Sequence, residues 1–139
     1  MKTLCFAVLA TTLAFANTAA AADEAAEKAA VTAAETWLKL VDASDYAKSW
    51  DEAAQLFKGA VTKADWDKTI KGVRGPLGKL VTRKVSTKKY AEKLPGAPDG
   101  KYVVITFETS FENKKEAVET VTPMLDKDGK WRVSGYFIK

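Results

Sequence analysis

The sequence predicts an α+β domain in which three helices pack on a four-stranded, curved antiparallel meander sheet with a cone-like shape. Two observations lead to this prediction. Residues 23–74 are rich in Ala, Glu and Lys and repeat apolar residues at helical spacing, whereas residues 80–138 alternate in polarity and are rich in β-branched residues. A sheet that is apolar on one face has to be covered there, and the preceding amphipathic helices are the available cover.

Residues 1–22 are predicted to be a cleavable secretory signal peptide. Lys2 precedes an apolar stretch from Leu4 to Phe15, and a run of small residues then ends at Ala22, which is the order of the three regions of such a signal. The apolar stretch is shorter than the roughly 20 residues of a membrane-spanning helix. We therefore expect one domain over residues 23–139, a periplasmic or secreted location, and no permanent membrane anchor.

The composition excludes several kinds of site. The chain has no histidine, and its single cysteine, Cys5, lies in the predicted signal peptide. The usual catalytic triads, thiol nucleophiles and zinc sites therefore cannot be built, and we expect no metal and no cofactor. Cations and anions are well mixed and the net charge is only +4, so we expect no nucleic-acid partner.

The first helix is predicted from Asp23 and is interrupted by the polar segment 42–45. Its apolar face consists of Ala30, Ala34, Trp37, Leu38 and Val41, which follow the spacing of one helix face. A second helix is predicted to start at a cap provided by Ser44 or Asp45 and to end at Gly59. This second helix carries Tyr46, Trp50, Ala53, Ala54 and Phe57 on one side.

The third helix is short and has a clear beginning and end. The segment from Thr62 to Asp65 resembles a capping box, with Asp in place of the usual Glu or Gln. Trp66, Ile70 and Val73 continue at helical spacing, and Gly75-Pro76 ends the helix. Strands are then predicted at residues 80–90, 101–112, 115–125 and 131–138, joined by segments with turn chemistry.

Two groups of residues allow both a structural and a functional interpretation. Trp37, Trp50, Trp66 and Trp131 fall on the apolar faces of their elements, which favours the core over an apolar ligand pocket. The first strand is basic, with Lys79, Arg83, Lys84, Lys88, Lys89 and Lys93. Lysines commonly protect an edge strand against pairing, and the alternative is a patch that docks on anionic envelope surfaces.

The candidate acid and base groups are carboxylates and tyrosines, namely Asp42, Glu108, Glu119, Tyr46 and Tyr136. A buried carboxylate could abstract a proton while a tyrosine stabilises an oxyanion, but salt-bridged or solvated side chains are the commoner outcome. Arg74 and Arg83 flank the rigid turn 75–78, where they can bond the turn or together hold a carboxylate or phosphate. The residues assigned to a ligand pocket are Tyr46, Trp50, Arg74, Arg83, Glu119 and Tyr136.

Several strings together resemble a secreted bacterial family called domain of unknown function 4019. They are Trp37-Leu38, Asp42, Tyr46, Ser49-Trp50, residues 74–78 with Arg83, residues 94–102, Glu119-Thr120-Val121 and residues 131–136. The resemblance implies a bacterial envelope or secreted protein, and it supplies no catalytic residues. More distantly, the order of elements is similar to the nuclear-transport-factor-2-like and cystatin-like cone folds, although this chain lacks their strand or hairpin between the second and third helices.

The leading functional hypothesis is a non-catalytic binding module that holds a small ligand or an envelope protein between the helices and the sheet. The alternatives are a small isomerase or lyase that uses a buried carboxylate with Tyr46 or Tyr136, and docking of the basic strand on anionic surfaces. The sequence leaves the partner and the oligomeric state open.

Overall fold

The computed structural model describes residues 15–139, so the part of the predicted signal peptide at residues 1–14 lies outside the described residues. The elements are α1 (Phe15–Asp42), α2 (Tyr46–Asp51), α3 (Gln55–Ala60), α4 (Lys63–Arg74), a 3-10 turn η1 (Gly75–Leu77), β1 (Leu80–Ala91), β2 (Tyr102–Phe111), β3 (Lys114–Leu125) and β4 (Trp131–Ile138). The predicted α+β class and the four-stranded curved antiparallel sheet are confirmed.

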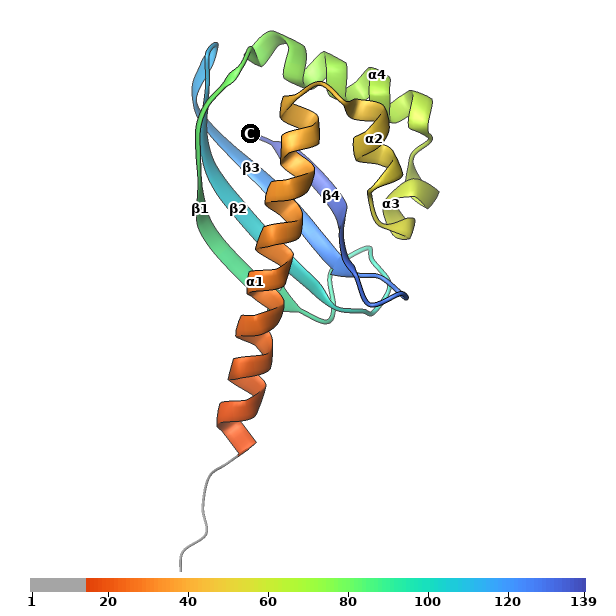
Figure 1. The fold of residues 1–139 in the computed structure, drawn as a ribbon, viewed down its shortest axis with the longest axis vertical. Helices are drawn as coiled ribbons and strands as arrows, with labels where there is room; N and C mark the ends of the chain where they lie inside the picture. Colours follow the sequence, from red (N-terminus) through yellow and green to blue (C-terminus); the bar gives the residue numbers. More distant parts are fainter. Residues whose placement is uncertain (1–14) are drawn as a thin grey trace, which may run out of the picture.

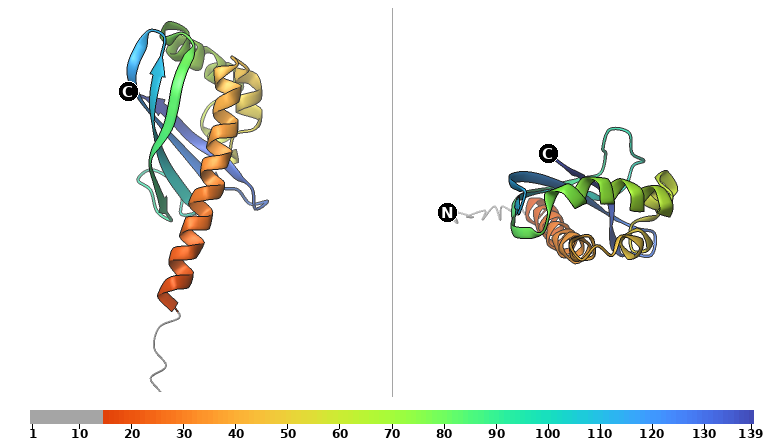
Figure 2. Two further views of the ribbon diagram at one scale, coloured as in Figure 1. Left: turned by 60° about the vertical axis from the view of Figure 1, so that its left-hand side comes forward. Right: turned by 90° about the horizontal axis from the view of Figure 1, so that it is seen from above.

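The sheet is a simple meander in the order β1-β2-β3-β4, and the helices lie on one of its faces. Helix α1 crosses that face and contacts all four strands, while the first half of α1 projects beyond the sheet (Figure 1). Helix α2 packs against α1, α4 packs against α2 (Figure 2), and α3 contacts β4. Within residues 15–139 no helix packs on the opposite face, which we call the uncovered face.

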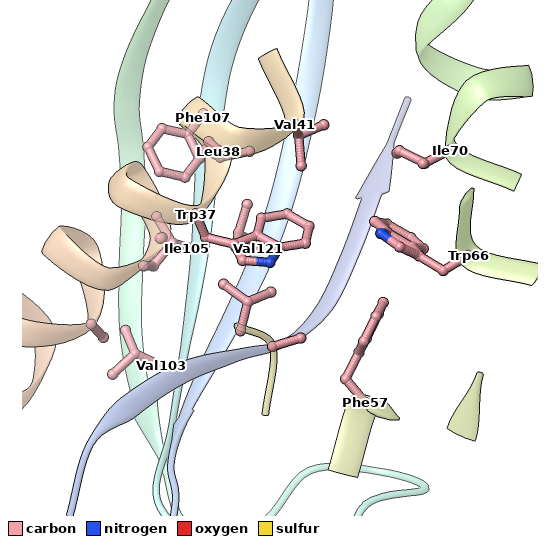
Figure 3. Packing of buried hydrophobic residues seen from close by; sticks show 14 of the residues in the cluster. Trp37, Leu38, Val41, Phe57, Trp66, Ile70, Val103, Ile105, Phe107 and Val121 are labelled. Carbon is pink, nitrogen blue, oxygen red and sulfur yellow. The ribbon is translucent and has the colours of Figure 1, made fainter. Parts of the chain in front are cut away.

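The space between helices and sheet is filled by one apolar cluster. Figure 3 shows Trp37 and Leu38 of α1 between the strand residues Ile105 and Val121 and the helix residue Trp66. Aromatic rings meet edge to face within this cluster, with the Phe57 and Trp66 centroids 4.9 Å apart, a favourable arrangement for aromatic pairs. The predicted core role is confirmed for Trp37 and Trp66, whereas Trp50 and Trp131 are only partly buried.

Helix α1 ends in a Schellman motif centred on Ser44. The Asp45 N–H donates to the Leu40 carbonyl, and the Ser44 N–H donates to the Val41 carbonyl, while Ser44 itself adopts a left-handed conformation with φ of 61°. The sequence prediction gave Ser44 or Asp45 the role of a side-chain cap for the next helix. In the structure Asp45 occupies the N-cap position of α2 without a side-chain capping bond.

The predicted second helix is wrong in its extent, because it is divided into α2 and α3 and the helix count is four rather than three. Ala54 is extended, with φ of −61° and ψ of 153°, and its N–H donates to the Val133 carbonyl of β4 at 2.8 Å. In a continuous helix this N–H would instead donate to the Trp50 carbonyl, four residues earlier. Gly59, the predicted end, lies inside α3, and the chain leaves the helix at Val61 instead.

Helix α4 begins and ends as the sequence predicts. The Thr62 hydroxyl accepts a hydrogen bond from the Asp65 N–H at 3.2 Å, and the helix ends at Arg74, directly before Gly75 and Pro76. The chain then turns into β1 at Gly78, whose φ of 73° and whose closeness to Glu112 and Asn113 leave no room for a side chain. This turn brings Arg74 and Arg83 to the same end of the sheet.

Candidate functional site

The most concentrated polar chemistry in the described residues is a buried charged cluster at the end of the sheet where α1 and α4 meet it. Every strand and two helices contribute one side chain each. The members are Asp42 of α1, Arg74 of α4, Arg83 of β1, Thr109 of β2, Glu119 of β3 and Tyr136 of β4. All six lie on the helix-covered side of the sheet.

Local structure fixes the positions of these side chains. Asp42 is the last residue of α1, just before the Schellman turn, and Arg74 is the last residue of α4. Arg83 lies opposite Thr109 in the ladder between β1 and β2, and both share the inner face with buried Phe107. The end of each helix is thereby aimed at the same stretch of sheet.

Glu119 is the centre of the cluster and its side chain is fully buried, with 0% exposed. Its Oε1 accepts from Arg83 Nε at 2.7 Å and from the Thr109 hydroxyl at 2.7 Å. Its Oε2 accepts from Arg83 Nη2 at 3.2 Å and from the Tyr136 hydroxyl. Both carboxylate oxygens therefore have two partners, which is how a buried charge is tolerated.

Arg83 bridges the two carboxylates of the cluster. Its Nη1 donates to Asp42 Oδ2 at 2.7 Å and its Nη2 donates to Asp42 Oδ1 at 2.9 Å, so Asp42 and Glu119 hold two adjacent edges of one guanidinium group and share Nη2. Burial lowers the pKa of Arg83, but the hydrogen bonds and charges of the two carboxylates outweigh burial and raise that pKa above its ordinary value. Arg83 is therefore permanently charged.

Arg74 completes the charge balance from the helix layer. Its Nη2 donates to Asp42 Oδ1 at 2.9 Å, and its guanidinium lies over the Phe111 ring at 4.7 Å from the centroid, a cation–π contact. Arg74 Nε and Nη1 are buried and have no hydrogen-bond partner in the part of the chain that the structure describes. With two arginines and two carboxylates the cluster is neutral as a whole.

The two acid and base candidates Glu119 and Tyr136 hydrogen-bond to each other inside the cluster. Tyr136 donates its hydroxyl proton to Glu119, and burial, followed by the charge of Glu119, raises the pKa of this tyrosine well above its usual value. A general base needs a free lone pair within reach of a substrate proton, and Glu119 has both oxygens engaged. The Tyr136 hydroxyl is likewise committed to Glu119.

The structure brings together four of the six predicted pocket residues, namely Arg74, Arg83, Glu119 and Tyr136. The other two belong elsewhere, since Tyr46 is buried in the apolar cluster and Trp50 Nε1 donates to the Val61 carbonyl at 2.8 Å. Among the acid and base candidates, Asp42 joins the charged cluster. Glu108 instead forms an exposed ion pair with Lys84 at 3.0 Å on the uncovered face.

Ser49 is a buried polar residue to which the sequence analysis gave no structural role, although Ser49-Trp50 is among the strings that resemble the family. Its hydroxyl accepts from Trp66 Nε1 at 2.9 Å and donates to the Tyr46 carbonyl, and its own carbonyl accepts from Trp37 Nε1 at 2.8 Å. Two indole donors are thus satisfied by one residue inside the core. The sequence signal was weak, because a serine beside Trp50 on a helix usually indicates an exposed position.

A hollow opens on the uncovered face, where β1, β2 and β3 approach the hairpin 111–114. This hollow, which we call the outer groove, has a volume of about 710 Å³. The residues that line it include Thr82, Lys84, Ser110, Lys115, Glu116 and Val118, and also Arg83 and Thr109 of the charged cluster. A second groove of about 470 Å³ lies between α1 and β4 and is lined by Trp37 and Trp131.

Residues 15–139 contain no group of three or more acidic, Cys or His side chains placed to hold a metal ion. No helix in the same range has the length and apolar character needed to cross a membrane.

Comparison with known proteins gives one match. A family model described as "Protein of unknown function (DUF4019)" matches residues 33–136, most of the chain. No curated protein and no solved structure matches, so the likeness to cone folds stays a prediction. The matched range includes Asp42, Arg74, Arg83, Glu119 and Tyr136, all members of the charged cluster. The chain therefore belongs to the DUF4019 family of proteins of unknown function.

Proposed function

We propose that this chain is an exported, non-catalytic binding domain that takes a small amphipathic organic anion in the outer groove. The observation that carries the proposal is the contrast between the two faces of the sheet. The helix-covered face is filled by the apolar cluster and the neutral charged cluster, whereas the uncovered face has a hollow of about 710 Å³. That volume lies within the roughly 300–1,000 Å³ of small-molecule sites.

The lining of the outer groove supports an amphipathic anion as the ligand class. Val118 provides an apolar surface with 41% of the residue exposed, and Thr82 and Ser110 offer hydroxyl groups. Lys84 is paired with Glu108, but Lys115 and Lys139 form no ion pair within the described residues. An alkyl or aryl carboxylate would bury its apolar part against Val118 and meet these two ammonium groups, which outnumber Glu116, the one other charged side chain of the lining that forms no ion pair within the described residues.

The binding mode differs from the one expected from sequence, which placed the ligand between helices and sheet. Trp37 and Val121 occupy that space in the core (Figure 3). The isomerase or lyase alternative has one observation in its favour, the buried Glu119 facing the Tyr136 hydroxyl. The saturated hydrogen bonding of Glu119 makes this pair a structural contact in our proposal.

Export to the periplasm or cell exterior is the cellular part of the proposal, and it rests on the signal-like pattern of residues 1–22. The test is intact-mass spectrometry of the protein recovered from the periplasm and from the cytoplasm of an expressing bacterium. We expect the periplasmic form to begin at Asp23. A full-length chain retained in the cytoplasm would contradict export.

The test of binding is a titration of the ¹⁵N-labelled protein with three probes that share one tail, namely octanoate, octanol and octylamine. We expect octanoate to cause saturable shifts in the amides of Thr82, Ser110 and Val118, and octylamine to cause none. Val118→Asp should abolish these shifts by charge repulsion. The matched control is Val73→Asp, because Val73 is 42% exposed and lies on α4, away from the groove.

Two results would contradict the proposed site. Saturable shifts centred on Trp37 and Trp131 would move binding to the groove between α1 and β4. Octanoate shifts that persist unchanged in Val118→Asp would show that the outer groove is not the site.

A further inference from the structure

We propose that the β1 edge of the sheet docks on an anionic lipid membrane surface through a stripe of four lysines that form no ion pair within residues 15–139, assisted by two exposed valines. The four lysines, which we call the lysine stripe, are Lys79, Lys88, Lys89 and Lys93. This interaction is independent of the outer groove, so it stands or falls separately from the proposed ligand.

The lysine stripe lies along an outer edge of the sheet. β1 is an outer strand of the sheet, because the strand order is β1-β2-β3-β4, and it runs along one side of the molecule (Figure 1). A strand of 12 residues is about 40 Å long at the usual rise per residue. Lysines before, within and after the strand therefore span an extended edge rather than a compact pocket.

Strand β1 presents lysines on both of its faces. Lys88 lies opposite Ile105, whose face is the buried one, and Lys89 lies opposite Val104 on the uncovered side. The register shift between Val85 and Thr87 is a bulge that also increases local twist. Because lysines lie on both faces of the edge, with Glu92 as an acidic residue between Lys89 and Lys93 in the sequence, the edge itself, and not one face of the sheet, is the surface suited to an anionic plane.

The stripe lysines differ from the other basic residues of β1 in their ion pairing. All four stripe lysines are exposed, and within residues 15–139 none of them forms an ion pair, unlike Lys84, which pairs with Glu108. The guanidinium of Arg83 is engaged inside the charged cluster. The charges of the stripe are thus available to an external partner.

Two exposed valines near the start of the stripe favour a membrane over other anionic partners and over simple edge protection. Val81 in β1 is 60% exposed, and Val73 at the end of α4 is 42% exposed; both belong to the segment 73–81 that leads into the stripe. Edge protection accounts for lysines but not for exposed apolar side chains beside them. Val81 is two residues from Lys79, so at this end of the stripe a cation lies near exposed apolar side chains, which suits the boundary between lipid headgroups and acyl chains.

The expected strength follows from the number of charges. Each lysine near an anionic bilayer increases binding on the order of fivefold at physiological salt, and the effect disappears within a Debye length. Four lysines therefore give binding that is readily measured on vesicles rich in anionic lipid and lost on neutral ones.

The experiment is sedimentation of the full chain with vesicles of equal parts phosphatidylglycerol and phosphatidylcholine, and with vesicles of phosphatidylcholine alone. The first variant replaces the stripe, as Lys79→Gln, Lys88→Gln, Lys89→Gln and Lys93→Gln together. The matched control removes four other exposed lysines that form no ion pair in the described residues, as Lys28→Gln, Lys39→Gln, Lys68→Gln and Lys127→Gln. Both variants carry the same net charge and the same N-terminus, so any membrane affinity of residues 1–22 cancels.

We expect the wild type and the control variant to bind the anionic vesicles, with affinity falling steeply between 50 and 300 mM salt, and the stripe variant to bind at least tenfold more weakly. Val81→Ser should weaken binding a few-fold without changing the salt dependence. Circular dichroism and thermal unfolding establish that each variant is folded. Equal losses in the stripe and control variants would reduce the effect to net charge, and absence of wild-type binding would show that the stripe only protects the edge; either result overturns the proposal.

Discussion

At the level of single residues, Glu119 and Tyr136 show how this chain keeps charged chemistry inside a small domain. Removing a carboxylate from water costs several kcal/mol unless partners compensate, and Glu119 has Arg83, Thr109 and Tyr136 as partners. The sequence identified both Glu119 and Tyr136 as titratable candidates. It could not show that they meet, because β3 and β4 bring them together only through the register of the sheet.

The raised pKa of Tyr136 makes stability depend on alkaline pH. In the unfolded chain this tyrosine ionises at about pH 10, whereas burial and the charge of Glu119 keep it protonated to higher pH in the folded state. Above pH 10 the unfolded state therefore binds fewer protons than the folded state, and stability falls as the pH rises. This group contributes a slope of up to about 1.4 kcal/mol per pH unit.

Tyr136→Phe removes that dependence, so urea denaturation between pH 8 and 11.5 should give a flatter profile for the variant than for the wild type. At pH 8 the variant should be less stable by about 1.5–3 kcal/mol, because it loses a hydrogen bond to a charged group. Parallel profiles for the two proteins would mean that Tyr136 ionises equally easily in both states.

At the level of elements, local signals decided where helices start and end when no distant residue competed for the backbone. Thr62 caps α4 as predicted, and Gly75-Pro76 ends it. The second predicted helix failed at Ala54, where β4 takes a backbone N–H through the Val133 carbonyl. Nothing near Ala54 in the sequence signals this bond, because Val133 is far along the chain and alanine is a good helix former.

The cap at Thr62 provides the prediction at this scale. Thr62→Ala should lower the free energy of unfolding by about 1 kcal/mol, because the Asp65 N–H loses its side-chain acceptor. Thr62→Ser keeps an acceptor oxygen and should remain within about 0.5 kcal/mol of the wild type. The measurement is denaturant-induced unfolding of all three proteins, and equal losses in Ala and Ser would indicate that the threonine methyl, not the hydroxyl, matters.

At the level of the whole molecule, the charged cluster joins the helix layer to the sheet. Asp42 of α1 and Glu119 of β3 share Arg83 of β1, so three elements that are distant in sequence depend on one guanidinium group. Residues that share a partner show non-additive effects on stability. The cluster should therefore behave as one energetic unit.

A double-mutant cycle of Asp42→Asn and Glu119→Gln tests this unit. Glu119→Gln alone should cost about 3–5 kcal/mol, because it leaves Arg83 buried with part of its charge uncompensated. The double variant should differ from the sum of the single variants by about 0.5–3 kcal/mol. As a control, Asp42→Asn combined with Thr62→Ala should be additive within about 0.5 kcal/mol, and additivity in both cycles would show that the carboxylates act independently.

Local patterns in the sequence specify the α+β class, the four strands, the capped α4 and the apolar faces that form the core. These features follow from periodicity, turn chemistry and capping, which act over a few residues. Other features emerge only from the packed fold. These are the separation of α2 from α3, the two hydrogen bonds that Ser49 accepts from tryptophans, and the position of the large hollow on the uncovered face. The packed fold also brings four predicted pocket residues into one cluster and leaves Tyr46 and Trp50 outside it; the four are Arg74, Arg83, Glu119 and Tyr136. Buried hydrogen bonds and ion pairs form between groups that the packed layers bring within about 3 Å of each other. These groups are distant in the sequence, so no local pattern encodes which of them will meet.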